Sequence, residues 1–470
     1  MKPAAPLSNS PLGTEPVGRL LVKYAVPAIL SALLGAVYNL TDQVFIGHAI
    51  GYLGNAATTV AYPITIVCGA VGLLFGIGGT VHFNILMGKG NREEAVRYGA
   101  GGISMLVLSG LGLMLLTLLL TGPVLYLFGA TEEVLPLART YLRIIAVGMP
   151  FLLLTTGGTL LVRADGSPNY TLLCSLAGVG ANILLDYLFL FRVGLGIAGA
   201  AWATVLGQLL SAGMVVWYLL HFKTAKLRRS DFAVEGKRVS AMAKIGAAAS
   251  LNQVAMLLSQ VALNDSLRHY GGLSVYGSEA ALASAGVVAK VNMIFYSVMI
   301  GFSIGCEPIM AFNYGAKKYG RVRETYRKTL LFVVLIGAVE CLCFWVFPNQ
   351  LLSLFGEGSE AYGEFAIRYM HIFMLMVAIN GVAPVTMNML SSTGKTKRGT
   401  VISLTRQIFI FLPLLLILPL VFQIDGVLCA GPIADGLAMV ISLLVVWPEL
   451  RKMRQMEGEL SQTGEPDAPQ

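Results

Sequence analysis

The stretch FGATEEVLPLARTYLRIIAVGMPFL, which begins at Phe128, is repeated in altered form as FGEGSEAYGEFAIRYMHIFMLMVAI, which begins at Phe355. Gly166 and Gly394 are separated by almost the same interval as these two starting points. Solenoid repeats are about 20–50 residues long. The interval here is several times longer, so it indicates a duplicated half-protein.

The composition of the chain is that of a membrane protein. Of its 470 residues, 56% are hydrophobic and only 12% are charged, whereas soluble domains carry about 25% charged residues. Uncharged apolar runs cover residues 103–121 and 408–422. About 20 apolar residues cross a bilayer, and they must be helical because lipid offers the backbone no hydrogen-bond partner. We therefore expect an all-α membrane protein.

The apolar runs predict twelve transmembrane helices, six in each repeat. Their expected ranges are 20–47, 57–87, 99–127, 134–162, 170–192, 197–221, 246–270, 281–312, 329–348, 360–391, 400–422 and 427–448. An even number of spans per repeat keeps the two halves parallel, related by an axis along the membrane normal. Duplicated halves in a chain this apolar point to a transporter with its site between or inside the halves.

The repeats divide the chain into two pseudo-symmetric six-helix lobes. We expect an N-lobe over residues 1–221, with a cytoplasmic N-terminal tail, and a C-lobe over residues 244–450. The polar stretch 222–243 is expected to be a cytoplasmic linker, and the polar residues 451–470 a disordered cytoplasmic tail.

The net charge of +8 reports membrane orientation, not nucleic-acid binding. Lysine and arginine gather in alternate loops, near residues 89–97, 163, 223–238, 317–328 and 395–398. The intervening loops carry acidic residues, and Arg192 and Arg268 at span ends are exceptions. The positive-inside rule then predicts that both termini are cytoplasmic.

Ionisable groups inside spans are costly, so function is their default interpretation. Asp42 lies in the first span, about four helical turns after Pro27, which can bend that helix. A buried carboxyl group either takes up a proton or stays ionised beside a cation. Asn182 and Asp186 are four residues apart in the fifth span, so both side chains share one helix face. An alternative is that Asp42 faces outer water and that Asp186 is an interfacial acid near Arg192.

The second repeat contains further charged groups at membrane depth. Glu307, beside Pro308 in the eighth span, is the first candidate for a substrate-binding or second ion-binding carboxylate, followed by Glu340 and Asp435. Each could equally be an interhelical hydrogen-bond partner. Lys290 is expected to form a structural ion pair. Arg406 could form an ion pair or extend toward the cytoplasmic boundary, and the second is favoured.

Other classes of function find little support in the sequence. The five histidines are scattered, and we find no nucleotide-binding loop, haem motif or HExxH zinc motif. A membrane-embedded enzyme needs a paired nucleophile and base or a metal cluster. We therefore expect a protein that is not an enzyme and that has no cofactor.

Several motifs together resemble the multidrug and toxic compound extrusion (MATE) family, over about residues 15–450. They are Pro27 followed by Tyr38-Asn39-x-x-Asp42-x-x-Phe45-x-Gly47-His48; the Gly88-Lys89-Gly90 turn; Arg163-Ala164-Asp165-Gly166; Asn182-x-x-x-Asp186; and Gly305-x-x-Pro308-x-x-x-x-Asn313-Tyr314-Gly315-Ala316. The pattern is closer to the bacterial DinF/MepA-like branch than to the NorM-like branch.

The resemblance implies two lobes around a V-shaped cavity that opens alternately outward and inward. It implies export of cationic or amphipathic compounds in exchange for H+ or Na+. The family's coupling residues map to Asp42, Asn182 and Asp186, with Thr204 and Tyr141 as further N-lobe polar residues. Sodium could bind among the first three of these. The family's helix hinge maps to Pro27.

The chain also departs from the family pattern. Glu307 stands where glutamine is common, which adds a charge to the C-lobe, and the tenth span has no deep carboxylate of the NorM type. A lipid-linked saccharide flippase of the same superfamily is the alternative function, for which Arg139, Arg143 and Arg368 could supply cavity charge. The resemblance implies a monomer in the bacterial inner membrane, contacting lipids and small molecules and no nucleic acid.

Overall fold

The structure is a computed structural model that describes residues 11–128, 130–353 and 360–462. All regular elements in these ranges are helical. The first half contains α1 (Pro11–Thr14), α2 (Val17–Ile50), α3 (Tyr52–Gly88), α4 (Arg92–Leu127), α5 (Leu135–Ala164), α6 (Pro168–Tyr187), η2 (Leu188–Arg192) and α7 (Ile197–Leu220). After η3 (Arg229–Phe232), the second half contains α8 (Gly236–Gly272), α9 (Ser278–Gly315), α10 (Tyr319–Val346), α11 (Pro348–Ser353), α12 (Glu360–Phe373), α13 (Val377–Asn380), α14 (Val382–Ser392), α15 (Thr396–Leu404), η4 (Thr405–Phe411) and α16 (Leu412–Gln462).

The described helices provide the predicted number of membrane crossings. Ten helical segments are long and apolar enough to span a bilayer, and α12 with α13–α14 forms an eleventh span bent by 50°. The last of these ten segments, Thr405–Leu460, consists of η4 and most of α16. It holds two crossings, because the chain reverses at Gln423, whose φ is 51° and ψ −129°. Arg406 and Asp435 lie on either side of Gln423 and are 2.5 Å apart, whereas a straight helix would separate them by about 43 Å. The predicted all-α fold of twelve transmembrane helices is confirmed.

The span predicted over residues 360–391 is present, but it is broken. Three helices, α12, α13 and α14, replace it, with breaks at Leu375 and Gly381. Pro384 lacks the N–H group that would bond the carbonyl of Asn380, and glycine has a low helix propensity. The local sequence therefore accounts for the break at Gly381, whereas these residues do not account for the break at Leu375.

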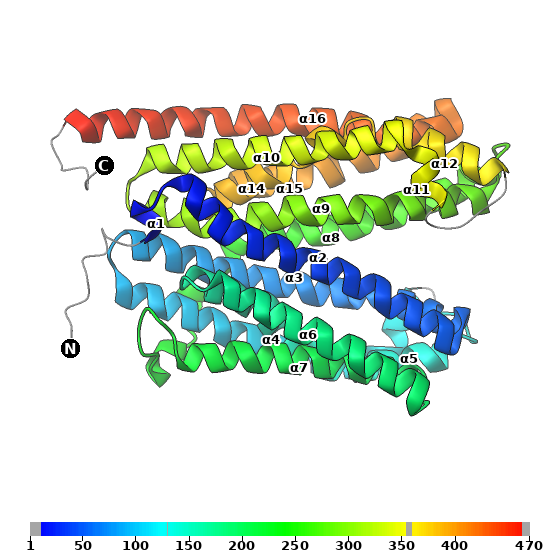
Figure 1. The fold of residues 1–470 in the computed structure, drawn as a ribbon, viewed down its shortest axis with the longest axis horizontal. Coiled ribbons are helices and arrows are strands. Elements are labelled where there is room, and N and C mark those ends of the chain that lie inside the picture. Colours follow the sequence, from blue (N-terminus) through cyan, green and yellow to red (C-terminus); the bar gives the residue numbers. More distant parts are fainter. Residues whose placement is uncertain (1–10, 129, 354–359, 463–470) are drawn as a thin grey trace.

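The helices form two lobes, each with a buried cluster of its own, and a further cluster joins the start of α2 to the second lobe. The lobe of α2–α7 occupies the lower half of Figure 1 and the lobe of α8–α16 the upper half. Phe83, Leu106 and Leu153 lie in a buried cluster of the first lobe, and Phe344 and Phe365 lie in one of the second. Because lipid tails are as apolar as these side chains, close packing must hold the lobes together.

Glycines bring the two lobes into backbone contact. A side chain at Gly78 of α3 would overlap the carbonyl of Met242 on α8, and a side chain at Gly305 of α9 would overlap Ala25 on α2. Gly78 and Gly305 are separated by the same interval as the repeated stretches at Phe128 and Phe355, so each repeat contributes the same contact.

A second pair of equivalent glycines marks the end at which the lobes close. Gly88 of α3 lies against Phe312 of α9, and Gly315 of α9 lies against Ile85 of α3. This end carries α1 and the lysine- and arginine-rich loops, and we call it the basic end. Toward the opposite end, α2 diverges from α9 (Figure 1).

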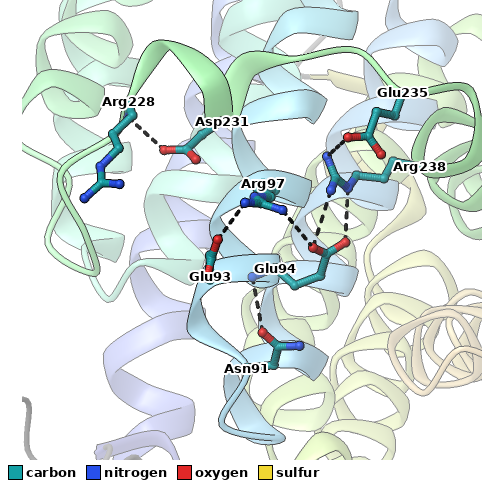
Figure 2. A network of polar contacts seen from close by, with 8 residues as sticks. All are labelled: Asn91, Glu93, Glu94, Arg97, Arg228, Asp231, Glu235 and Arg238. Atoms are coloured by element: carbon teal, nitrogen blue, oxygen red, sulfur yellow. Dashed lines mark hydrogen bonds and ion pairs between the residues drawn. The ribbon is translucent and has the colours of Figure 1, made fainter.

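Ion pairs fasten the connection between the lobes to α4. Glu94 on α4 accepts bonds from Arg238 on α8 at 3.1 and 3.4 Å, and Arg238 also pairs with Glu235 at 2.9 Å (Figure 2). The linker predicted over 222–243 is shorter than expected, because α8 already begins at Gly236. Met242 lies in the part of α8 that falls within the predicted linker. Its side chain packs into the core of the first lobe, which stabilises these additional helical turns.

The tail predicted to be disordered over 451–470 is helical in its first part. Residues 451–462 continue α16, and 463–470 lie outside the described residues. Met453 is buried in a core cluster, and Glu457 pairs with Arg323 on α10. These contacts explain why a polar sequence remains helical.

The close contact between the lobes predicts that adding one methyl group at a contact glycine lowers the stability of the protein. Gly246→Ala on α8 places its Cβ on the carbonyl of Leu74 of α3. We expect a loss of about 1–3 kcal/mol through overpacking, seen as a lower apparent melting temperature in detergent. Gly213→Ala on α7, where nothing lies within 4 Å, is the matched control. Equal melting temperatures for the two variants would contradict the proposed backbone contact.

Candidate functional site

Two acidic side chains meet inside the first lobe. Asp42 on α2 and Asp186 on α6 are 6% and 0% exposed, and their carboxyl groups lie close enough to share a hydrogen bond. Asp42 therefore does not face outer water, and the alternative of an interfacial Asp186 beside Arg192 also fails. The Arg192 guanidinium lies over the ring of Tyr187, 5.7 Å from its centroid. Two carboxyl groups can touch only if a proton or another cation lies between them.

The oxygen atoms of this pair lack donors. Apart from the mutual contact, Asp42 Oδ1 and both carboxyl oxygens of Asp186 accept no hydrogen bond from the described residues. The buried Oδ1 of Asn182, one turn before Asp186, also has no partner there. Buried acceptors are normally satisfied, so an orphaned cluster requires an explanation. A set of acceptors without donors suits a proton or a hard cation.

Hydroxyl and amide groups from four helices, α2, α5, α6 and α7, surround the acids. Asn182 Nδ2 donates to Thr204 Oγ1 on α7 at 3.5 Å, and the hydroxyl groups of Thr204 and Tyr38 are 3.3 Å apart. Tyr141 on α5 is buried and lies within electrostatic range of both acids. The structure thus brings together all five residues predicted for cation coupling.

Tyr38 was missed as a site residue, although it lies in the quoted motif. It precedes Asp42 by four residues, so the two share one helix face. That spacing could have identified it. Its contact with Thr204 links α2 to α7 beside the acids.

Glu307 lies apart from these acids, at the lobe boundary. It is buried on α9 and interacts electrostatically with Arg163, which is buried at the end of α5. Nε and Nη1 of Arg163 have no hydrogen-bond partner among the described residues. Opposite charges from the two lobes therefore face each other near the basic end.

The other charged residues of the second repeat are dispersed. Arg406 pairs with Asp435, so the expectation that Arg406 extends to the boundary is wrong; a buried acid within reach is the better partner. Glu340 on α10 is fully buried, with both oxygens unpartnered in the described chain. Lys290 is exposed on α9.

Asp165, in the loop between α5 and α6, has a structural environment. It accepts bonds from the backbone N–H groups of Lys223 and Thr224 at 2.7 and 2.9 Å and from the Tyr218 hydroxyl at 2.9 Å. Burial raises the pKa of Asp165, while these hydrogen bonds act in the opposite direction. The carboxylate fixes the start of the linker.

Pro27 lies inside α2, which passes through it as one helix. Proline removes one backbone hydrogen bond at this point. The Ser31 hydroxyl donates to the Pro27 carbonyl at 2.9 Å. The structure therefore places the predicted hinge within a continuous helix. Among the described residues, no group of three or more His, Cys, Asp or Glu side chains could hold a metal ion.

Solved structures with the same fold are transporters. One described as the MATE multidrug transporter DinF-BH is 30% identical and superimposes with a TM-score of 0.85, covering 93% of this chain and 96% of that one. Another, described as the outward-facing conformation of a multidrug resistance MATE family transporter of the MOP superfamily, has a TM-score of 0.88 at 18% identity, covering 96% and 99%.

Sequence relatives agree with the structural ones. Multidrug export protein MepA of Staphylococcus aureus (strain N315) is 25% identical over 434 residues, which are 92% of this chain and 94% of that protein. MepA of Staphylococcus saprophyticus is 24% identical over 432 residues, covering 91% and 93%. The MatE family model matches residues 27–188 and 271–417, most of both lobes. The chain therefore belongs to the MATE family of membrane transporters.

Proposed function

We propose that this protein is a secondary antiporter that exports cationic or amphipathic organic compounds in exchange for H+. The observation that carries the proposal is the contact between Asp42 and Asp186, buried and without donors among the described residues, inside one lobe of a two-lobe membrane protein. Relatives named multidrug export proteins and multidrug transporters support the substrate class.

A proton fits the acid pair better than Na+. The two carboxyl groups lie within hydrogen-bonding reach of each other, and one shared proton can bridge them without any further ligand. A sodium ion would need several more oxygen ligands around it, as hard cations generally do. In the described chain, Asn182 Oδ1 is the one further orphaned acceptor beside the pair.

The lobes provide the conformational change. The basic end is closed by the glycine contacts, and the positive-inside rule makes it the cytoplasmic end, with both termini in the cytoplasm of a bacterial cell. The structure then corresponds to an outward-facing state. A bound ion shifts such an equilibrium only by its different affinity for the two states. In the cycle that we propose, proton uptake by the acids bends α2 at Pro27, reshapes the cavity and favours release of the exported compound.

No observation favours the flippase alternative. Arg368 donates to both oxygens of Asp425 at 3.0 and 2.7 Å, so its charge is neutralised. Arg139 and Arg143 are exposed on α5. We propose that the chain acts as a monomer, without enzymatic activity and without a cofactor.

The identity of the coupling ion can be tested in proteoliposomes loaded with a fluorescent organic cation. With the basic end facing the lumen, a gradient with acid outside should drive release of the compound. A sodium gradient at equal pH on both sides should drive none. Release driven by sodium alone would overturn the assignment of H+ as the coupling ion.

The acid pair predicts the behaviour of two variants. Asp42→Asn and Asp186→Asn each remove one of the two groups that share the proton, so gradient-driven efflux should fall to the level of protein-free liposomes. Size-exclusion profiles should stay normal, because asparagine preserves shape. Glu132→Gln, which removes an acid outside the helices, should transport normally. Full efflux by either aspartate variant would show that the pair does not couple transport.

The charges at the lobe boundary predict a shift between states. Glu307→Gln leaves Arg163 buried without an opposite charge, so the basic end should open more often. Spin labels at the exposed positions Glu93 and Lys452, in a variant without native cysteines, should then report a larger population of long distances. Glu324→Gln, which breaks an exposed pair with Lys328, is the control. Identical distance distributions for wild type and Glu307→Gln would refute the role of this charge.

A further inference from the structure

A polar cavity lies inside the C-lobe, away from Asp42 and Asp186 of the N-lobe. Its volume is about 170 Å³, and it is bordered by α8, α9, α12, η4 and α16. Arg406 and Asp435 reach it from η4 and α16, and Asn292 reaches it from α9. Tyr369, Phe373 and Phe411 supply aromatic walls.

The duplication shows why the C-lobe has this cavity at a point where the N-lobe is closely packed. Gly178 and Arg406 are separated by the same interval as Gly166 and Gly394, so they occupy equivalent positions in the two repeats. In the N-lobe, a Cβ at Gly178 would lie 3.2 Å from the Gly207 carbonyl oxygen, so α6 and α7 pack backbone to backbone. An arginine at the equivalent position cannot be accommodated in such a contact. In the C-lobe, Arg406 instead pairs with Asp435 on α16, and both residues line the cavity.

Arg406 uses only one of its three guanidinium nitrogens to bond Asp435. Its Nε donates to Asp435 Oδ1 at 2.5 Å, and its two terminal nitrogens make no hydrogen bond to the described residues. Arg368, elsewhere in the same lobe, instead uses Nε and Nη2 on both oxygens of Asp425. Arg406 also lies in the π-helical turn η4, and such turns are frequent at functional sites.

The remaining groups define the ligand. The outer face of a guanidinium binds a carboxylate through two parallel hydrogen bonds. Asn292 Oδ1 is buried without a partner among the described residues, so it can accept one hydrogen bond from a donor group of the ligand. A cavity of about 150 Å³ holds a benzene molecule. The C-lobe cavity therefore has room for one aromatic ring between its aromatic walls.

We propose that this C-lobe cavity is a binding site for aromatic carboxylates, held by the terminal nitrogens of Arg406. Asp435 orients the guanidinium through Nε and leaves its outer face to the ligand. The inference rests on the proposed transport function, since it extends the range of bound compounds from cations to those that carry a carboxylate.

Equilibrium binding tests the site without any ion gradient. Benzoate and the neutral isostere benzamide are titrated into the full-length protein in detergent, and binding is followed by saturation-transfer NMR. A charge-assisted pair should make the dissociation constant of benzoate at least about tenfold lower than that of benzamide. Benzoate that binds wild-type protein no more tightly than benzamide overturns the proposal, whatever the variants do.

A double variant tests whether Arg406 causes the tighter binding of benzoate relative to benzamide. Arg406→Gln combined with Asp435→Asn removes both charges together and leaves no buried charge unpaired. Benzoate should then bind only as tightly as benzamide, and retained benzamide binding shows that the cavity is intact. Arg368→Gln combined with Asp425→Asn removes another arginine–aspartate pair of the C-lobe and should keep the tenfold preference. A preference that survives in the Arg406 double variant overturns the assignment.

The outcome is separable from that of the antiport proposal. Loss of the benzoate preference with intact proton-driven efflux of an organic cation would remove the C-lobe site alone. Benzoate binding in a protein that shows no proton-driven efflux would remove the antiport proposal alone.

Discussion

The contact between the carboxyl groups of Asp42 and Asp186 is the constraint on which the proposed function depends. Two acids from different helices lie in a nearly dry environment, and no side chain or backbone N–H of the described residues donates to their free oxygens. If both groups were ionised, their repulsion would separate α2 from α6. The packing of these helices is therefore linked to the presence of a proton or cation between the acids. An ion can control the conformation of the protein only if helix packing depends on whether the ion is bound, and this link provides that dependence.

The duplicated architecture converts this local linkage into a movement of lobes. Equivalent glycines of the two repeats bring α3 against α8 and α9 against α2, and a second equivalent pair brings α3 against α9 at the closed basic end. Each repeat therefore contributes the same contacts. Such backbone contacts have little tolerance for intermediate positions, which favours two discrete arrangements over a gradual one. Arg163 and Glu307 add a charge interaction across this closure. In the proposed cycle, opening of the basic end would expose both groups to water.

The duplication also shows how two lobes of one fold acquire different chemistry. In the N-lobe, small residues at Gly178 and Gly207 allow α6 and α7 to approach closely. In the C-lobe, Arg406 stands at the position equivalent to Gly178 and pairs with Asp435, and a cavity results. The two glycines of the tight N-lobe crossing, Gly178 and Gly207, thus correspond to Arg406 and Asp435, which line a polar cavity in the C-lobe.

Much of this could be predicted from sequence, because the signals are local. Apolar runs indicated the number of spans, and the four-residue spacing of Asn182 and Asp186 placed them on one face. The meeting of Asp42 with that face came from family resemblance. Contacts between distant segments could not be predicted in this way: the pairing of Arg406 with Asp435, the charges of Arg163 and Glu307, and the break after Phe373 depend on tertiary packing. The helical tail beyond Arg451 was missed because its stabilising partner, Arg323, lies on another helix.

In the proposed cycle, Asp42 and Asp186 carry a proton that binding of the exported compound displaces. The most direct measurement is proton release into a weakly buffered detergent solution when a transported organic cation is added to the purified protein. The account predicts release from the wild type that saturates with ligand, and none from Asp42→Asn even at concentrations at which the ligand binds. Release of the same size from both proteins, or binding to the wild type without release, would contradict it.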